Sequence, residues 1–60
     1  MFSVMRIYDD GVSGTEATLT ISNALVACSI YLEDPECIGV KIWDSETGEI
    51  LFDYWRENNA

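Results

Sequence analysis

The chain has 60 residues, of which eleven are Asp or Glu, three are Lys or Arg and none is His, and its formal net charge is -8 at pH 7. A chain of this length forms one domain, expected over residues 1–60, and so acidic a surface disfavours direct binding to nucleic-acid phosphates or anionic membranes. Without histidine, the usual proton shuttle at neutral pH and the catalytic triads built on it are excluded.

The N-terminal part of the chain predicts two strands. Phe2 to Tyr8 is β-prone and has apolar residues at both odd and even positions, which is typical of a strand between two layers. Asp9-Asp10-Gly11 ends this strand, and Val12 to Thr15 reads as a Gly and Ser loop. Glu16 to Thr20 is expected to add a short second strand.

The segment Ser22 to Glu33 fits either a helix or a strand. As a helix it has Thr20 or Ser22 as N-cap and ends at Asp34-Pro35. Its apolar stripe is then Ile21, Leu25, Cys28 and Leu32, with Val26 and Ile30 beside it. As a strand it alternates between the sets Val26, Cys28, Ile30, Leu32 and Ala27, Ser29, Tyr31, Glu33. Its length favours the helix, and Tyr31 would join an intermolecular contact if it lay on the outer side.

The last third of the chain, Ile38 to Trp55, predicts a β-hairpin. The loop Glu46-Thr47-Gly48 suits a type I turn followed by glycine in the left-handed region. This loop would set the opposed pairs as Ser45 with Glu49, Asp44 with Ile50, Trp43 with Leu51, Ile42 with Phe52, Lys41 with Asp53, Val40 with Tyr54 and Gly39 with Trp55. In the last pair, Trp55 would lie across the bare backbone of Gly39.

Both faces of this hairpin are expected to be apolar, because opposed residues share a face. The face assigned to the core carries Val40, Ile42, Ile50, Phe52 and Tyr54. The other face carries Trp43, Leu51 and Trp55, a group large enough to mark a contact surface. We expect these three residues to form a homo-oligomer interface. The alternatives are docking on a different protein and cover by the chain's own N-terminal strand or loop.

The expected fold class is therefore α+β: a small antiparallel sheet of three or four strands with one central helix, in the order β-β-α-β-β, ending in a C-terminal β-hairpin. The two cysteines, Cys28 and Cys37, have no partner pair at metal-binding spacing, and the chain starts without a secretory signal pattern. Reduced, buried thiols in a cytoplasmic protein are expected. No apolar run approaches 18 residues, so we expect no membrane span.

Carboxylates are the remaining candidate functional groups. We expect no cofactor and more readily a binding protein than an enzyme, the enzymatic alternative being a metal-dependent DNA-nicking site at Asp9, Asp10 and Glu16. Asp53 is better explained by its partner Lys41 than by acid-base catalysis. The other carboxylates gather at predicted turns, where they are candidates for contact with a basic groove: Asp9, Asp10, Glu33, Asp34, Glu36, Asp44, Glu46 and Glu49.

The run Ala24 to Trp55, with its core LEDPECIGVKIWDSETGEILFDYW, resembles a pattern of small bacterial and phage domains in which a helix leads through an acidic Asp-Pro turn into a hairpin closed by Thr-Gly-Glu. The small size and strong acidity are similar to phage-borne inhibitors of host nucleases, including anti-CRISPR and anti-restriction proteins that imitate DNA. This resemblance implies an acidic interaction protein that inhibits a nucleic-acid-processing enzyme. A structural subunit of a larger assembly is a further alternative.

Overall fold

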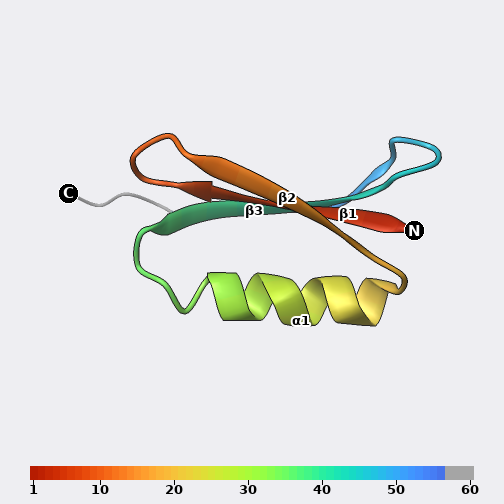
Figure 1. Cartoon of the computed structure of the whole chain (residues 1–60), viewed down its shortest axis with the longest axis horizontal. Coiled ribbons are helices and arrows are strands. Elements are labelled where there is room, and N and C mark those ends of the chain that lie inside the picture. Colours follow the sequence, from red (N-terminus) through yellow and green to blue (C-terminus); the bar gives the residue numbers. More distant parts are fainter. Residues whose placement is uncertain (57–60) are drawn as a thin grey trace.

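The computed structural model describes residues 1–56 and consists of one four-stranded antiparallel sheet with one helix. The elements in chain order are β1 (Phe2–Tyr8), β2 (Ser13–Thr18), α1 (Ile21–Tyr31), β3 (Cys37–Asp44) and β4 (Ile50–Trp55). The strands lie in the order β2-β1-β3-β4, and α1 runs along one face of the sheet (Figure 1). The predicted α+β class, with its β-β-α-β-β order and C-terminal hairpin, is confirmed.

The turn after β1 is tighter than the sequence suggested. Gly11 has a φ of +88°, and the backbone N–H of Val12 donates to Asp10 Oδ1 at 2.9 Å. Tyr8 N donates to Val12 O at 2.8 Å, so strand pairing begins at once and Ile7 lies opposite Ser13. The predicted loop Val12 to Thr15 and strand Glu16 to Thr20 are therefore wrong in their bounds, because β2 already begins at Ser13.

The segment after β2 is helical, and the strand alternative is wrong. The Thr20 hydroxyl accepts a hydrogen bond from Asn23 N at 3.1 Å, so Thr20 rather than Ser22 is the N-cap. At the other end, Arg56 donates to Leu32 O at 2.6 Å and to Pro35 O at 3.3 Å. This guanidinium binds the Leu32 carbonyl at the end of α1 and the Pro35 carbonyl of the connection to β3, and joins both to the end of β4.

The face that α1 buries differs from the predicted stripe. Ala24 and Cys28 are buried, whereas Leu25, Val26 and Ile30 are exposed. Small side chains on the inner face let the helix lie close to the sheet. Tyr31 packs against the core as a partly buried residue, so the condition under which it would join an intermolecular contact is not met.

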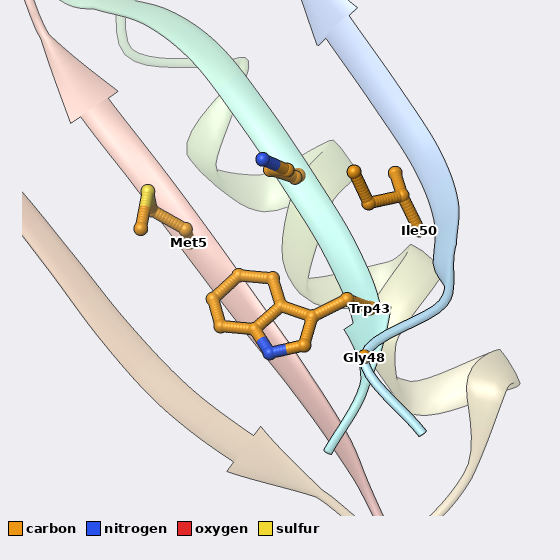
Figure 2. Close-up of a pocket in the computed structure, with 5 residues that line it drawn as sticks. Met5, Trp43, Gly48 and Ile50 are labelled. Atoms are coloured by element: carbon orange, nitrogen blue, oxygen red, sulfur yellow. The ribbon is translucent and has the colours of Figure 1, made fainter. Parts of the chain in front are cut away.

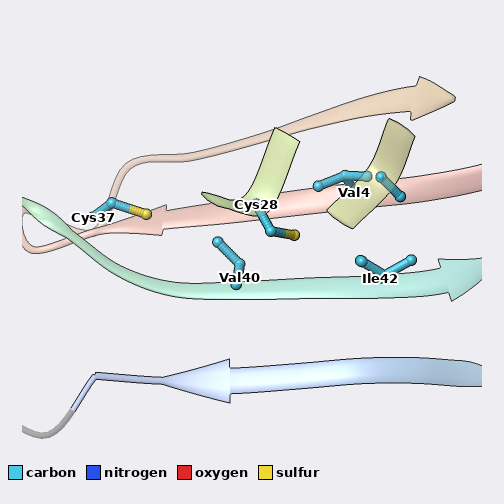
Figure 3. Close-up of a cluster of buried hydrophobic side chains, with 6 residues drawn as sticks. Val4, Cys28, Cys37, Val40 and Ile42 are labelled. Carbon is cyan, nitrogen blue, oxygen red and sulfur yellow. The ribbon is translucent and has the colours of Figure 1, made fainter. Parts of the chain in front are cut away.

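The core is thin and lies between α1 and the two central strands (Figure 3). Its side chains are small or medium-sized. The buried members are Val4, Ala24, Cys28, Cys37, Val40 and Ile42. Phe2, Tyr8, Ala27, Tyr31 and Leu32 pack around them as partly buried neighbours.

The hairpin has the predicted register only in the half that is distant from the β3–β4 loop. The pairs of Gly39 with Trp55, Val40 with Tyr54, Lys41 with Asp53 and Ile42 with Phe52 are confirmed. Beyond them the register shifts, so that Trp43 lies opposite Ile50 and not Leu51. Leu51 is the extra residue of a β-bulge.

The hairpin loop explains why the pairs distant from the loop were nevertheless predicted correctly. Asp44 N donates to Glu49 O at 2.9 Å, and Gly48 N donates to Asp44 O at 2.8 Å. Asp44 therefore pairs with Glu49, and Ser45 belongs to the loop rather than to the last pair. Gly48 has a φ of +79°, as the sequence predicted. Ser45 adds one residue to the loop on the β3 side, and Leu51 adds one residue on the β4 side. The two additions offset one another, so the register from Ile42 and Phe52 onward is the predicted one.

Candidate functional site

The first candidate site is a cluster of five carboxylates at one end of the molecule, which we call the acidic end. It combines the turn between β1 and β2 with the connection from α1 to β3, which lie at the same end of the molecule in Figure 1. Its residues are all exposed: Asp9, Asp10, Glu33, Asp34 and Glu36.

One backbone hydrogen bond joins the two halves of the acidic end. Asp9 N donates to Glu36 O at 2.8 Å, although the two residues are far apart in the sequence. A shallow depression at this junction is lined by Tyr8, Asp9, Asp10 and Glu36. The carboxylates are therefore held by the fold near one another and are not carried on independent loops.

Two of the five carboxylates also shape the local backbone. Asp10 Oδ1 accepts from Val12 N, and Asp34 Oδ1 accepts from Glu36 N, each at 2.9 Å. These Asx turns explain why aspartate occupies both positions. Asp9, Glu33 and Glu36 carry the charges that can be removed without touching these turns.

The other predicted carboxylates lie at the opposite end of a molecule 37 Å long. There, Asp44 Oδ1 accepts from Glu46 N at 2.8 Å and from Thr47 N at 3.3 Å, which shapes the β3–β4 loop. Glu46 and Glu49 are exposed on the same loop. The eight residues predicted for a basic groove therefore form two separate groups of five and three.

The structure does not bring together the three residues of the alternative DNA-nicking site, Asp9, Asp10 and Glu16. Asp9 and Asp10 lie on the β1–β2 turn, whereas Glu16 lies within β2, opposite Val4. Within residues 1–56, no three His, Cys, Asp or Glu side chains are placed to hold a metal ion together.

The second candidate site is the face of the sheet turned away from α1, which we call the outer face. Met5, Trp43 and Ile50 project from it, and the Trp43 indole lies over β1 beside Met5 (Figure 2). Because of the bulge, Ile50 lies on this face, and its predicted place in the core is wrong. β1 pairs beside β3 in the same sheet and does not cover this face, so cover by the N-terminal strand is wrong as well.

Trp55 also lies on the outer face, over Gly39 as predicted. A Cβ atom at Gly39 would meet Trp55 Cε3 at 2.8 Å. The indole thus covers bare backbone on one side and remains exposed on the other.

The sequence did not reveal that β4 is exposed on both faces. Helix α1 contacts β1, β2 and β3 but does not reach β4. Phe52 and Tyr54 share a face with the core residues Ile42 and Val40, yet they remain 37% and 42% exposed. Element widths would have predicted this. A helix is about 10–12 Å across, whereas four strands about 4.8 Å apart form a wider sheet, so one helix leaves part of the sheet uncovered.

The two thiols belong to the core and not to either surface. Cys28 and Cys37 are both buried and unbridged. Burial, with smaller contributions from Cys37 and Glu16, raises the pKa of the Cys28 thiol above its ordinary value. A protonated thiol is a poor nucleophile, so Cys28 is suited to packing and not to chemistry.

Arg6 has a structural role at the inner face of the sheet. Its guanidinium lies 4.8 Å from the centre of the Tyr31 ring, and Nη1 donates to the Tyr31 hydroxyl at 3.4 Å. Arg6 therefore anchors the last turn of α1 on β1.

Comparison with known proteins gives no relative: no family model, no curated protein and no solved structure matches this chain at a significant level. The helix described within residues 1–56 is too short to cross a membrane.

Proposed function

We propose that this chain is a non-enzymatic inhibitor whose acidic end occupies the basic groove of a nucleic-acid-processing enzyme. The observation that carries the proposal is the convergence of five exposed carboxylates, tied together by the hydrogen bond from Asp9 N to Glu36 O. Grooves that bind DNA or RNA are lined with Lys and Arg, which form charge-assisted hydrogen bonds with carboxylates as they do with phosphates. The buried, unbridged thiols support action in the cytoplasm, where thiols stay reduced.

The electrostatics of the whole chain favour the same partner. A net charge of -8 on 60 residues attracts cationic surfaces over a distance set by salt. Of the three cationic side chains, Arg6 is engaged with Tyr31, and Arg56 with Leu32 O and Pro35 O. Arg56 therefore places one positive charge beside the acidic end, where the five carboxylates outnumber it and leave a net negative surface for a partner.

The test is a DNA-cleavage assay with a panel of purified restriction endonucleases and RNA-guided nucleases. We expect the chain to inhibit a member of the panel, and the inhibition to weaken steeply between about 50 and 200 mM salt and in the presence of competing DNA. No inhibition across the panel, or inhibition indifferent to salt and DNA, contradicts the proposal.

A pair of charge-matched variants assigns the inhibition to the acidic end. Asp9→Asn/Glu33→Gln/Glu36→Gln removes three charges there, and Glu16→Gln/Glu46→Gln/Glu49→Gln removes three elsewhere. We expect a loss of about tenfold or more in inhibition for the first and a much smaller loss for the second. Equal losses would show that only net charge matters.

A further inference from the structure

Strand β4 is an edge strand, and within residues 1–56 no further strand lies beside its free edge. Arg56 N donates to Ile38 O at 2.7 Å, so the backbone of Arg56 points toward β3. Along an antiparallel strand the N–H and C=O groups of successive residues point to alternate sides. Phe52 and Tyr54 therefore bond to β3, whereas Asp53 and Trp55 direct their backbone groups to the free edge.

The side chains of β4 offer different chemistry on the two faces of the sheet. On the face that α1 partly covers, Phe52 and Tyr54 are 37% and 42% exposed, because α1 contacts β1, β2 and β3 but not β4. On the outer face Asp53 lies opposite Lys41 of β3. Because β4 is an edge strand, Asp53 has a strand neighbour on one side only. A strand added to the free edge would meet aromatic side chains on one face and a carboxylate on the other.

We propose that the free edge of β4 binds an extended basic segment of another protein as a fifth strand. The backbone of the segment bonds to Asp53 and Trp55, and its side chains alternate between the two faces. On the outer face a Lys or Arg of the segment lies opposite Asp53. On the other face its apolar side chains cover Phe52 and Tyr54 where α1 does not reach.

Charge complementarity selects a basic segment. Opposite charges on directly opposed residues stabilise a sheet, and like charges there destabilise it, so Asp53 favours a cation and disfavours an acidic strand. Glu46 and Glu49 are exposed on the loop that leads into β4, and the whole chain carries a charge of -8. This field attracts a basic segment from a distance and repels a second copy of the chain.

The other edge strand, β2, lacks the same combination. Its sequence SGTEAT is polar, and it presents the carboxylate of Glu16 without aromatic neighbours on the strand. Apolar side chains on an exposed edge favour the addition of a strand, so β4 is the edge that the segment occupies. The amides of β2 then serve as an internal control.

This contact goes beyond the proposed inhibition, because it uses β4 and not the acidic end. Asp53→Pro removes an N–H that points to the free edge and leaves the bonds of Phe52 and Tyr54 to β3 in place. It should lose the basic segment and keep the inhibition of the nuclease. Asp9→Asn/Glu33→Gln/Glu36→Gln should lose the inhibition and still bind the segment when the segment is saturating. The two proposals therefore fail separately.

The first measurement is amide hydrogen exchange, followed by NMR, with a synthetic peptide that alternates valine and lysine over the length of β4. At about ten times the dissociation constant, exchange of the Asp53 and Trp55 N–H should slow by about tenfold. The amides of β2 should not change. Two control peptides should slow neither amide: one with glutamate in place of lysine, and one with the same side chains but N-methyl groups on the edge that would face β4.

The second measurement is the affinity of the valine–lysine peptide for three variants that keep the helical circular dichroism of the wild type. Asp53→Pro should weaken binding by about tenfold or more. Asp53→Asn keeps the N–H and loses the charge, so it should weaken binding by about two- to fivefold. Glu16→Gln removes one charge from β2 and should weaken binding by less than about twofold.

Four results overturn the proposal. They are equal binding of the lysine and glutamate peptides, binding that leaves exchange at Asp53 and Trp55 unchanged, equal affinity of Asp53→Pro and Asp53→Asn, and no binding at millimolar peptide. Slower exchange at the same two amides on raising the concentration of the chain alone would assign the edge to a second copy and would overturn it as well.

Discussion

At Gly39 the backbone of β3 is covered by the ring of Trp55, across the strand pair. The sequence predicted this contact from register alone, because only two opposed positions, one bare and one aromatic, were needed. It did not predict Ala24, Cys28 and Tyr31 as the residues that hold α1. An apolar helix surface that includes Leu25, Val26 and Ile30 has no single hydrophobic side, so its sequence period does not say which side meets the sheet.

The contact between Gly39 and Trp55 predicts a sign change in a double-mutant cycle. In the wild type, Gly39→Ala should cost about 1–2 kcal/mol of unfolding free energy, because the new Cβ collides with the indole. In the Trp55→Ala background the same substitution should stabilise by about 0.5 kcal/mol, because alanine suits a strand better than glycine. Urea unfolding of the four proteins measures both effects, and additive values would show that the ring does not rest on Gly39.

At the scale of elements, alternation and turn chemistry predicted the strands β1, β3 and β4 and the left-handed Gly48, but not the detail of the hairpin tip. A three-residue loop without a bulge and a four-residue loop with one give the same pairs from Ile42 and Phe52 onward. The sequence pattern in that half is therefore equally compatible with both. What decides is the side chain of Asp44, whose bonds to Glu46 N and Thr47 N favour the longer loop.

The helix start yields a prediction with a matched control. Thr20→Ala removes the hydroxyl that accepts from Asn23 N and should lower the free energy of unfolding by about 1 kcal/mol. Ser22→Ala, the other N-cap candidate in the sequence, lies inside the first turn and should change it by no more than about 0.5 kcal/mol. Thermal unfolding followed by circular dichroism at 222 nm, a wavelength that reports helix, compares the two variants. A larger loss of stability for Ser22→Ala would show that Ser22 and not Thr20 is the N-cap.

At the scale of the whole molecule, like charges crowd at the acidic end while a second acidic group lies at the far end. The number of carboxylates can be read from the sequence, but their division into two groups cannot, because it depends on which turns the sheet brings together. The turn after β1 and the connection before β3 meet because β1 and β3 are neighbours in the sheet.

This crowding should destabilise the fold at low salt. Asp9→Asn/Glu33→Gln/Glu36→Gln should raise the melting temperature by about 4–8 °C for each 1 kcal/mol of repulsion removed. Glu16→Gln/Glu46→Gln/Glu49→Gln should raise it less, because those carboxylates are more dispersed. Both differences should shrink at about 0.5 M salt. Equal shifts of the melting temperature in the two variants, or shifts that persist in high salt, would show that the destabilisation does not come from repulsion at the acidic end.

The cancelling loop and bulge have a consequence for how the tip could rearrange. Moving Ser45 out of the loop and Leu51 back into the ladder leaves every pair from Ile42 and Phe52 onward unchanged. That slip would turn Ile50 from the outer face to the helix side and leave the length of the chain the same. The side chain that lies opposite Trp43 is thus set by the hairpin tip alone, and a substitution in the tip can change it without altering the rest of the sheet.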